Sequence, residues 1–258
     1  MELKTELGRI MIFLCLALPT ISIAQDSTKS KNIDPSKPTN LYTQVNLNME
    51  YQNRTGADVW GPRINVQKAF NPNNMAIVEV PFQFNTETGK FGISDLRVRY
   101  FNVLKRNISK KFIALAAFTD ITAPTGKYEN GLGTSNWSLA FGVITGFTFS
   151  KRFSFFPGIS YIHLTKPTTE SIPDQFKTVS DGIGLQLNAS VILNKSTFIF
   201  INPIPSFLNT NGDWNSNWLA EFSFNKIIKP NKFKMNISYN PNFSNGNYIL
   251  RLGATVFL

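Results

Sequence analysis

The sequence predicts an all-β protein, a transmembrane antiparallel up-and-down β-barrel of about 12 strands that follows an N-terminal signal peptide. Three observations favour this fold class. Apolar and polar residues alternate along twelve segments, the number of segments is even, and the connections between them alternate between short and long. A water-soluble β-sandwich is the alternative that alternation by itself leaves open.

Residues 1–24 have the layout of a secretory signal peptide. A basic start is followed by the apolar run 10–18, which is too short to span a bilayer, and Ser22 and Ala24 suit cleavage after Ala24. Cleavage would also remove Cys15, the only cysteine, so the mature chain would contain no disulfide and no thiolate ligand for a metal.

A polar segment separates the signal peptide from the first strand. Residues 25–40, QDSTKSKNIDPSKPTN, contain two prolines and hardly any apolar side chains, so they predict a disordered periplasmic N-terminal segment. This segment could also enter the barrel as a small plug, and the sequence leaves that question open. The barrel domain is expected to occupy residues 41–258.

The first half of the barrel domain shows the alternation most clearly. Successive side chains of a strand point to opposite faces, so one register should be apolar and the other polar. The opposed registers include Leu47 against Glu50 in 41–51, Val66 against Arg63 in 63–70, Val80 against Glu79 in 75–85, and Val98 against Arg97 in 95–103. Segment 112–121 is apolar on both faces, so its register is ambiguous.

The second half continues the pattern after a glycine-rich connection. The opposed registers include Phe141 against Ala140 in 137–149, Ile159 against Ser160 in 153–163, Leu185 against Gln186 in 182–193, Phe222 against Glu221 in 214–225, Ile237 against Lys234 in 233–239, and Leu252 against Arg251 in 248–258. Segment 197–204 is a weaker strand. Aromatic residues near many strand ends suit the girdles of a membrane barrel.

The lengths of the connections predict how the barrel is oriented. If the N-terminus is periplasmic, the tight turns at 71–74, 150–152 and 194–196 share one side, and the long loops 122–136 and 164–180 share the other. This asymmetry is expected of a barrel in the outer membrane of a Gram-negative bacterium, with the lipid bilayer as its partner. The last strand is expected to close on the first, because lipid cannot satisfy an unpaired strand edge.

Loop 122–136 carries glycine motifs that need an explanation. It lacks the earlier glycine and the Ser or Thr after Lys127 that a phosphate-binding loop requires, and it lacks the third glycine of a dinucleotide fingerprint. Together with Gly92-x-x-Asp95-Leu96, its Pro-Thr-Gly and Leu-Gly-Thr segments before Trp137 resemble the outer-membrane channel family named for the meta-cleavage pathway of phenol degradation. The resemblance covers residues 92 to about 143 and departs at Ser135, where the family tends to have glycine. It implies a barrel for uptake of small, often hydrophobic or aromatic molecules.

The polar registers predict a lumen lined by charged side chains: Glu50, Arg63, Glu79, Asp95, Arg97, Arg99, Glu221, Lys234 and Arg251. Such charges can brace the barrel, select solutes by sign, or both. Asp95, Arg97 and Arg99 occupy three successive inward positions. Pairing of Asp95 with a neighbouring Arg would leave a basic strip that favours anions.

The connections on the predicted periplasmic side hold ten basic residues and no acidic ones. They are Lys105, Arg106, Lys110, Lys111, Lys151, Arg152, Lys195, Lys226, Lys229 and Lys232. Solvated surface charge and attraction to inner-leaflet phospholipid head groups both fit this pattern. Nucleic-acid binding has no support in an exported barrel.

The predicted function is passive uptake of small solutes, anionic or aromatic and hydrophobic, through an outer-membrane channel. The alternatives are a lipid-hydrolysing enzyme of the phospholipase or lipid A deacylase type and a non-conducting structural or adhesive barrel. The only histidine, His163, is followed two residues later by Thr165 rather than by serine, so no catalytic residue is predicted. No cofactor or metal site is expected. The solute, the gating and the oligomeric state stay open.

Overall fold

The computed structural model describes residues 33–258, so the predicted signal peptide and residues 25–32 lie outside the described residues. Two short 3-10 helices, Tyr128–Asn130 and Asp174–Phe176, lie in loops. The strands are β1 (Gln44–Arg54), β2 (Ala57–Asn71), β3 (Asn74–Asn85), β4 (Lys90–Ile93), β5 (Leu96–Arg106), β6 (Phe112–Ala123), β7 (Ser138–Thr148), β8 (Phe153–Leu164), β9 (Ser180–Asn194), β10 (Thr197–Thr210), β11 (Asp213–Lys229), β12 (Phe233–Pro241) and β13 (Tyr248–Phe257).

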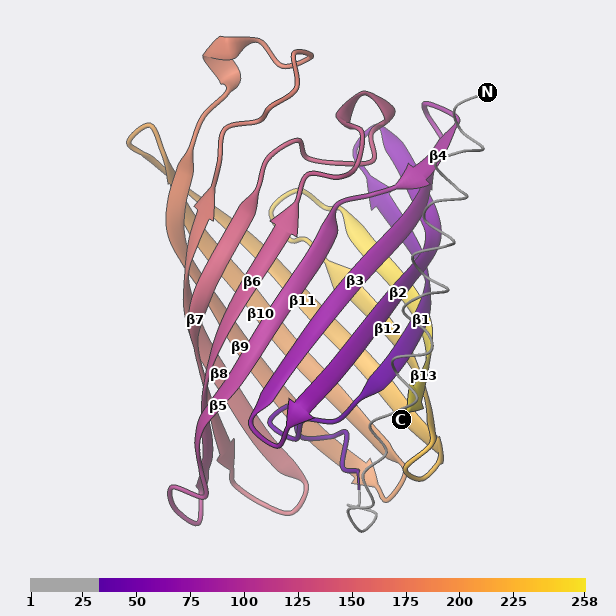
Figure 1. Ribbon diagram of the computed structural model, residues 1–258, viewed down its shortest axis with the longest axis vertical. Coiled ribbons are helices and arrows are strands. Elements are labelled where there is room, and N and C mark those ends of the chain that lie inside the picture. The colour runs from indigo at the N-terminus through magenta and orange to yellow at the C-terminus, as the bar shows by residue number, and fades with distance from the viewer. Residues whose placement is uncertain (1–32) are drawn as a thin grey trace. The chain divides into compact units, whose positions relative to one another are not determined.

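The strands form one closed antiparallel barrel (Figure 1). Each strand pairs with its neighbour in the chain, and β1 closes the barrel by pairing with β13 from Gln44 opposite Phe257 to Asn53 opposite Tyr248. The short β4 and the longer β5 both pair with β3 in the same direction. They are one wall strand interrupted at Ser94 and Asp95, so the wall has twelve strands and the predicted fold class is confirmed.

The wall is inverted relative to a water-soluble protein. Outward side chains such as Leu47, Phe141 and Ile237 are 53–59% exposed, whereas inward Glu50 and Asn225 are 2% exposed or less. Leaving so many large apolar side chains in water would be costly, because each one forgoes about 1.5–3 kcal/mol of burial energy. Hydrocarbon around the barrel removes that cost. Within residues 33–258, no helix has the length and apolarity needed to cross a membrane.

Some strands are longer than the sequence predicted, because they continue through prolines at which the predicted strands ended. The strand β2 was expected at 63–70 but begins at Ala57 and runs through Gly61 and Pro62. A Cβ at Gly61 would lie 2.1 Å from the Phe82 carbonyl oxygen, so the close approach of β2 to β3 requires glycine there. In β10, which runs through two prolines, the ladder to β9 is interrupted between Ile201 and Ser206 while the ladder to β11 continues.

The two ends of the barrel differ in the length of their connections (Figure 1). One end has tight turns, such as Pro72 and Asn73 between β2 and β3, and the other has the long loops 124–137 and 165–179. Residues 33–43 lie at the end with the tight turns. There Leu41 packs against the buried cluster of Val103, Ala114 and Ala116, and Arg106 donates to the Thr39 carbonyl at 2.9 Å.

Candidate functional site

The lumen contains three adjoining cavities that run from one end of the barrel towards the other. The first cavity has a volume of about 260 Å³, and Gln44 and Gln67 line it on the side of the tight turns. The second, about 490 Å³, shares Arg63 and Arg97 with it and reaches Asp95 at the end with the long loops. The third, about 350 Å³, also includes Arg97. Seven of the nine charged residues expected in the lumen line the first cavity: Arg63, Glu79, Arg97, Arg99, Glu221, Lys234 and Arg251.

Glu50, an eighth predicted residue, lies on β1 between Asn48 of the first cavity and Gln52 of the second, and it anchors a layer of ion pairs. Its side chain is nearly inaccessible, and Arg63 Nε and Arg251 Nε approach its Oε2 at 2.9 and 2.6 Å. Arg63 Nη2 also donates to Oε1 at 3.1 Å, so Arg63 binds the carboxylate with both sides of its guanidinium. Inward positions on β1, β2 and β13 are adjacent in the sheet, which is why three residues far apart in sequence meet here.

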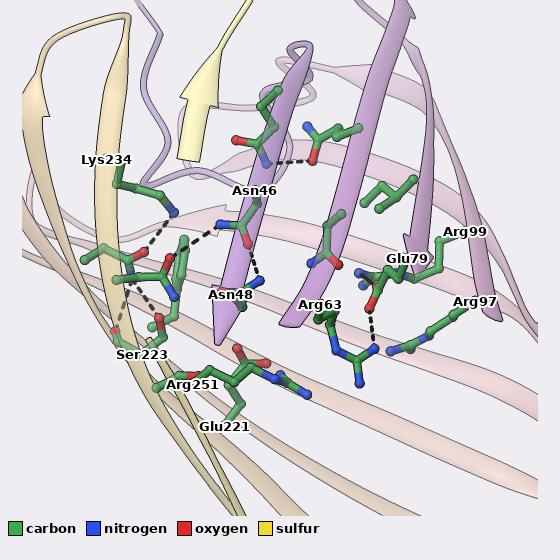
Figure 2. Close-up of a pocket in the computed structure, with 18 residues that line it drawn as sticks. Asn46, Asn48, Arg63, Glu79, Arg97, Arg99, Glu221, Ser223, Lys234 and Arg251 are labelled. Carbon is green, nitrogen blue, oxygen red and sulfur yellow. Dashed lines mark hydrogen bonds and ion pairs between the residues drawn. The ribbon is translucent and has the colours of Figure 1, made fainter. Parts of the chain in front are cut away.

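Glu79 extends this layer onto β3 and β5. It accepts from Arg63 Nη1 at 3.3 Å and pairs with Arg99 across the β3–β5 ladder (Figure 2). Arg97, the next inward residue of β5, donates from Nε to Asp120 Oδ1 of β6 at 2.8 Å. The layer thus joins four arginines to three carboxylates, Glu50, Glu79 and Asp120. Asp120 was missed because segment 112–121 had no clear polar register.

Lys234 faces this layer from the opposite side of the cavity (Figure 2). Its Nζ donates to Asn225 Oδ1 at 2.9 Å and lies 5.8 Å from the centre of the Phe198 ring. Within residues 33–258, neither Lys234 nor Glu221 takes part in an ion pair within 4.0 Å. The cavity wall on this side also includes the aromatic ring of Phe200. A solute in the cavity therefore meets a charged wall and a partly aromatic one.

Asp95 does not have the partner that the sequence suggested. It lies at the interruption between β4 and β5, and its carboxylate binds the long β6–β7 loop instead of an arginine. Oδ1 accepts from the Gly126 backbone N–H at 3.0 Å, and Oδ2 accepts from the backbone N–H and hydroxyl of Thr134, both at 2.8 Å. Asp95 still lines the second cavity, but it pairs with neither arginine. Arg97 and Arg99 are instead paired with Asp120 and Glu79, so they do not form the unpaired basic strip that the sequence suggested.

The β6–β7 loop is held across the barrel mouth by further contacts. Arg54 Nη1 of β1 donates to the Gly131 carbonyl at 3.1 Å, and Thr125 Oγ1 donates to the Ser94 carbonyl at 2.9 Å. Gly126 and Gly133 pack back to back, since a Cβ on Gly133 would lie 2.4 Å from the Gly126 carbonyl oxygen. The two sequence motifs that carry the family resemblance therefore form one structural unit. The glycines permit close packing of backbone, and we call this unit the Asp95 latch.

Ser135 links the latched loop to the long β8–β9 loop. Its φ of 62° lies in the left-handed region that favours glycine, the residue that the resembled family tends to have there. The Ser135 hydroxyl accepts from the Thr169 backbone N–H at 2.8 Å. The Ser135 carbonyl accepts from the Thr168 backbone N–H, also at 2.8 Å. Glu129 adds a second link by accepting from the hydroxyls of Thr169 and Ser171. These hydrogen bonds lower the pKa of the Glu129 carboxyl.

His163 lies at the end of β8 near the long loops, about a third exposed. Its Nδ1 lies 2.8 Å from Asp181 Oδ1, which also accepts from the Tyr161 hydroxyl. Within the described residues no serine hydroxyl hydrogen-bonds to His163. In the same part of the chain, no three His, Cys, Asp or Glu side chains gather in a way that could hold a metal ion.

Comparisons with known proteins agree on the fold. No protein-family model and no curated protein matches the sequence. Among solved structures, an outer membrane channel from Pseudomonas putida F1 is 13% identical, with a TM-score of 0.61 over 91% of this chain and 100% of its own. The NanC porin is 11% identical, with a TM-score of 0.60 over 83% and 100%. The KdgM porin, solved in complex with oligogalacturonate, is 10% identical, with a TM-score of 0.53 over 83% and 98%. The chain therefore has the fold of outer-membrane channel and porin barrels, and the channel-type barrel implied by the sequence resemblance is confirmed at the level of fold.

Proposed function

We propose that the protein is an outer-membrane channel through which small solutes diffuse passively, with anions favoured. The observation that carries this proposal is a closed twelve-stranded barrel with an apolar exterior and a chain of cavities lined by charged side chains. Outer-membrane barrels of this size can enclose a pathway, whereas barrels of eight strands are filled by side chains. The fold shared with the Pseudomonas channel and the two porins supports the same reading.

The charges of the first cavity support a preference for anions. Five basic and two acidic side chains line it. Glu50 and Asp120, which pair with Arg63, Arg251 and Arg97 of this lining, reduce the excess, and five basic against four acidic side chains still leave a positive net charge. A ring of basic groups in a narrow pore stabilises a passing anion and repels a cation. The KdgM structure contains an acidic oligosaccharide, and a carboxylated solute of modest size is the corresponding candidate here.

An enzymatic role has weaker support. His163 and Asp181 resemble part of a catalytic site, but Thr165 Oγ1 donates to the Lys166 carbonyl and accepts from the Trp137 backbone N–H, so it is not oriented by the histidine. A hydrolase needs its nucleophile within hydrogen-bond reach of its base. We therefore place His163 and Asp181 in a structural role at the edge of the membrane.

Single-channel recording in planar bilayers tests the proposal. In a salt gradient, the reversal potential of the wild type should have the sign that indicates higher permeability to anions than to cations. Lys234→Gln should shift this potential towards zero. Lys234 is the better first variant, because its removal leaves no carboxylate of the ion-pair layer unpaired. Lys90→Gln, a matched change at the exposed first residue of β4, should leave the reversal potential unchanged. Absence of conductance from a folded, heat-modifiable barrel would refute the channel function.

A panel of solutes would then define the substrate class. Liposomes containing the protein should swell faster in small organic anions than in neutral sugars of similar size. Replacing both Arg97 and Arg99 by Glu should reverse this order if the arginine wall sets the selectivity. An unchanged order in a folded double variant would assign these arginines to bracing alone.

A further inference from the structure

The end of the barrel with the tight turns carries a dense positive charge. Ten basic residues occupy four of its five turns and the adjoining strand ends, and we call them the basic rim: Lys105, Arg106, Lys110, Lys111, Lys151, Arg152, Lys195, Lys226, Lys229 and Lys232. All but Arg106 are exposed. Arg106 is half-buried and donates to the carbonyls of Thr39 and Pro72.

The charge of the basic rim is not neutralised by the described protein. Among residues 33–258, none of the ten forms an ion pair with a carboxylate. Lys226, the one Lys with defined partners, donates to the hydroxyls of Ser196 and Thr197. Ten like charges close to one another repel, so a partner that supplies several negative charges would stabilise this surface.

Apolar side chains exposed to the outside adjoin the basic rim. Lys105 follows Leu104, which is 58% exposed, and Lys229 follows Ile228, which is 54% exposed. Phe149 and Phe153 flank the pair Lys151 and Arg152 in the same way. The charged groups therefore lie at the boundary where the apolar surface of the wall ends. Long basic side chains at such a boundary keep their stems on the hydrocarbon and their charges among the head groups.

We propose that the basic rim binds the anionic head groups of phospholipids in the leaflet next to the tight turns. The ammonium and guanidinium groups would donate to phosphodiester oxygens, which lie at the depth that the adjoining apolar residues define. A soluble acidic protein would need a compact basic face, whereas these charges are spread over four turns around the barrel. The inference rests on the outer-membrane location given under the proposed function.

The opposite end provides the internal control. Its loops and strand ends hold eight acidic and five basic residues, a net charge of −3 against +10 for the basic rim. Anionic phospholipids should therefore gather at one end only. Four of its basic residues are exposed or half-buried on loops or at the first residue of β4, and their replacement removes as many charges as the rim variant does without touching the basic rim: Lys90, Lys127, Lys166 and Lys177.

Native mass spectrometry of the detergent-purified mature chain tests the proposal. The protein is titrated with phosphatidylglycerol and with phosphatidylcholine of the same chain length, and the bound lipids are counted. The rim variant replaces Lys110, Lys111, Lys151 and Arg152 by Gln, and the control variant replaces the four opposite lysines. Each Lys or Arg near an anionic surface contributes about fivefold in affinity. The wild type and the control should therefore prefer phosphatidylglycerol by about tenfold or more, while the rim variant should lose most of that preference.

Three outcomes would overturn the proposal. They are equal retention of the two lipids by the wild type, an unchanged preference in the folded rim variant, and displacement of phosphatidylglycerol by an equal charge of polyglutamate. The last would mean that the surface recognises a soluble acidic partner. Conductance is measured separately in neutral phosphatidylcholine bilayers, so that a failure of lipid binding and a failure of the channel function are distinguished.

Discussion

The two ends of the barrel differ in the length of their connections and in how their charged side chains are bonded. The end with the tight turns uses few residues, and within the described chain none of the ten basic-rim side chains pairs with a carboxylate. The end with the long loops carries mixed charges and ties them into hydrogen bonds, of which the Asp95 latch and the Ser135 link are the clearest. The comparison teaches that loop length alone does not measure mobility, because the longer loops here have the more specific contacts.

Removing the Asp95 latch should have the largest effect on this difference. Asp95→Ala deletes three hydrogen bonds to a carboxylate, and each such bond contributes about 1.5–3 kcal/mol. The β6–β7 loop should then leave the mouth, so that trypsin cleaves after the exposed Lys127 and single-channel conductance rises. Glu87→Gln, which removes a carboxylate from the neighbouring β3–β4 loop, serves as the control. A cleavable loop with unchanged conductance would show that the latch does not restrict the pathway.

Removing the Ser135 link should have a smaller effect, confined to the second loop. Ser135→Gly keeps the left-handed backbone but deletes the hydroxyl that accepts from Thr168 and Thr169. A neutral hydrogen bond contributes about 1 kcal/mol, so amide exchange at Thr169 should accelerate about fivefold. Trypsin cleavage after Lys127 should stay at the wild-type level, because the Asp95 latch is intact. If the Thr169 amide exchanged at the same rate in the wild type and in Ser135→Gly, the hydroxyl of Ser135 would not stabilise the β8–β9 loop.

The Glu129 link should give the smallest effect and one limited to acid. The folded pKa of Glu129 is lowered because Thr169 and Ser171 donate to its carboxylate. A lowered pKa means that this contact is fully present above the ordinary Glu pKa of about 4.3 and is lost as pH falls through the folded pKa. Amide exchange at Ser171, corrected for the intrinsic rate, should accelerate only in that acidic window. Glu129→Gln should abolish the dependence on pH.

The sequence predicted the strands well and the contacts between loops poorly, and the physical reasons differ. Strand faces follow from a period of two, which is why Leu47 and Glu50 could be assigned to opposite sides. Strand ends were missed at Pro62 and Pro205, because a proline loses one ladder bond yet can still pair on its other side.

The residues of the candidate site could be predicted from the sequence where their inward orientation follows from the alternation along a strand. Arg63, Glu79 and Arg251 line the cavity because their positions alternate inward. Asp95 was placed in the same series and lines the second cavity, but at the one-residue shift of register between β4 and β5 its carboxylate binds the β6–β7 loop rather than an arginine. The hydrogen bonds of Asp95 to Gly126 and Thr134 join residues 31 and 39 positions apart, so no local pattern could reveal them.

The seam between β1 and β13 has a consequence for biogenesis. Ten register positions join β1 to β13, so β1 must wait until all the other wall strands have been synthesised before it gains that partner. Every shorter species would leave two open edges, and each unsatisfied backbone group in hydrocarbon costs several kcal/mol. Insertion and closure should therefore occur together. A cellular insertion machine that shields both edges would be most needed by this chain just before its final strand arrives.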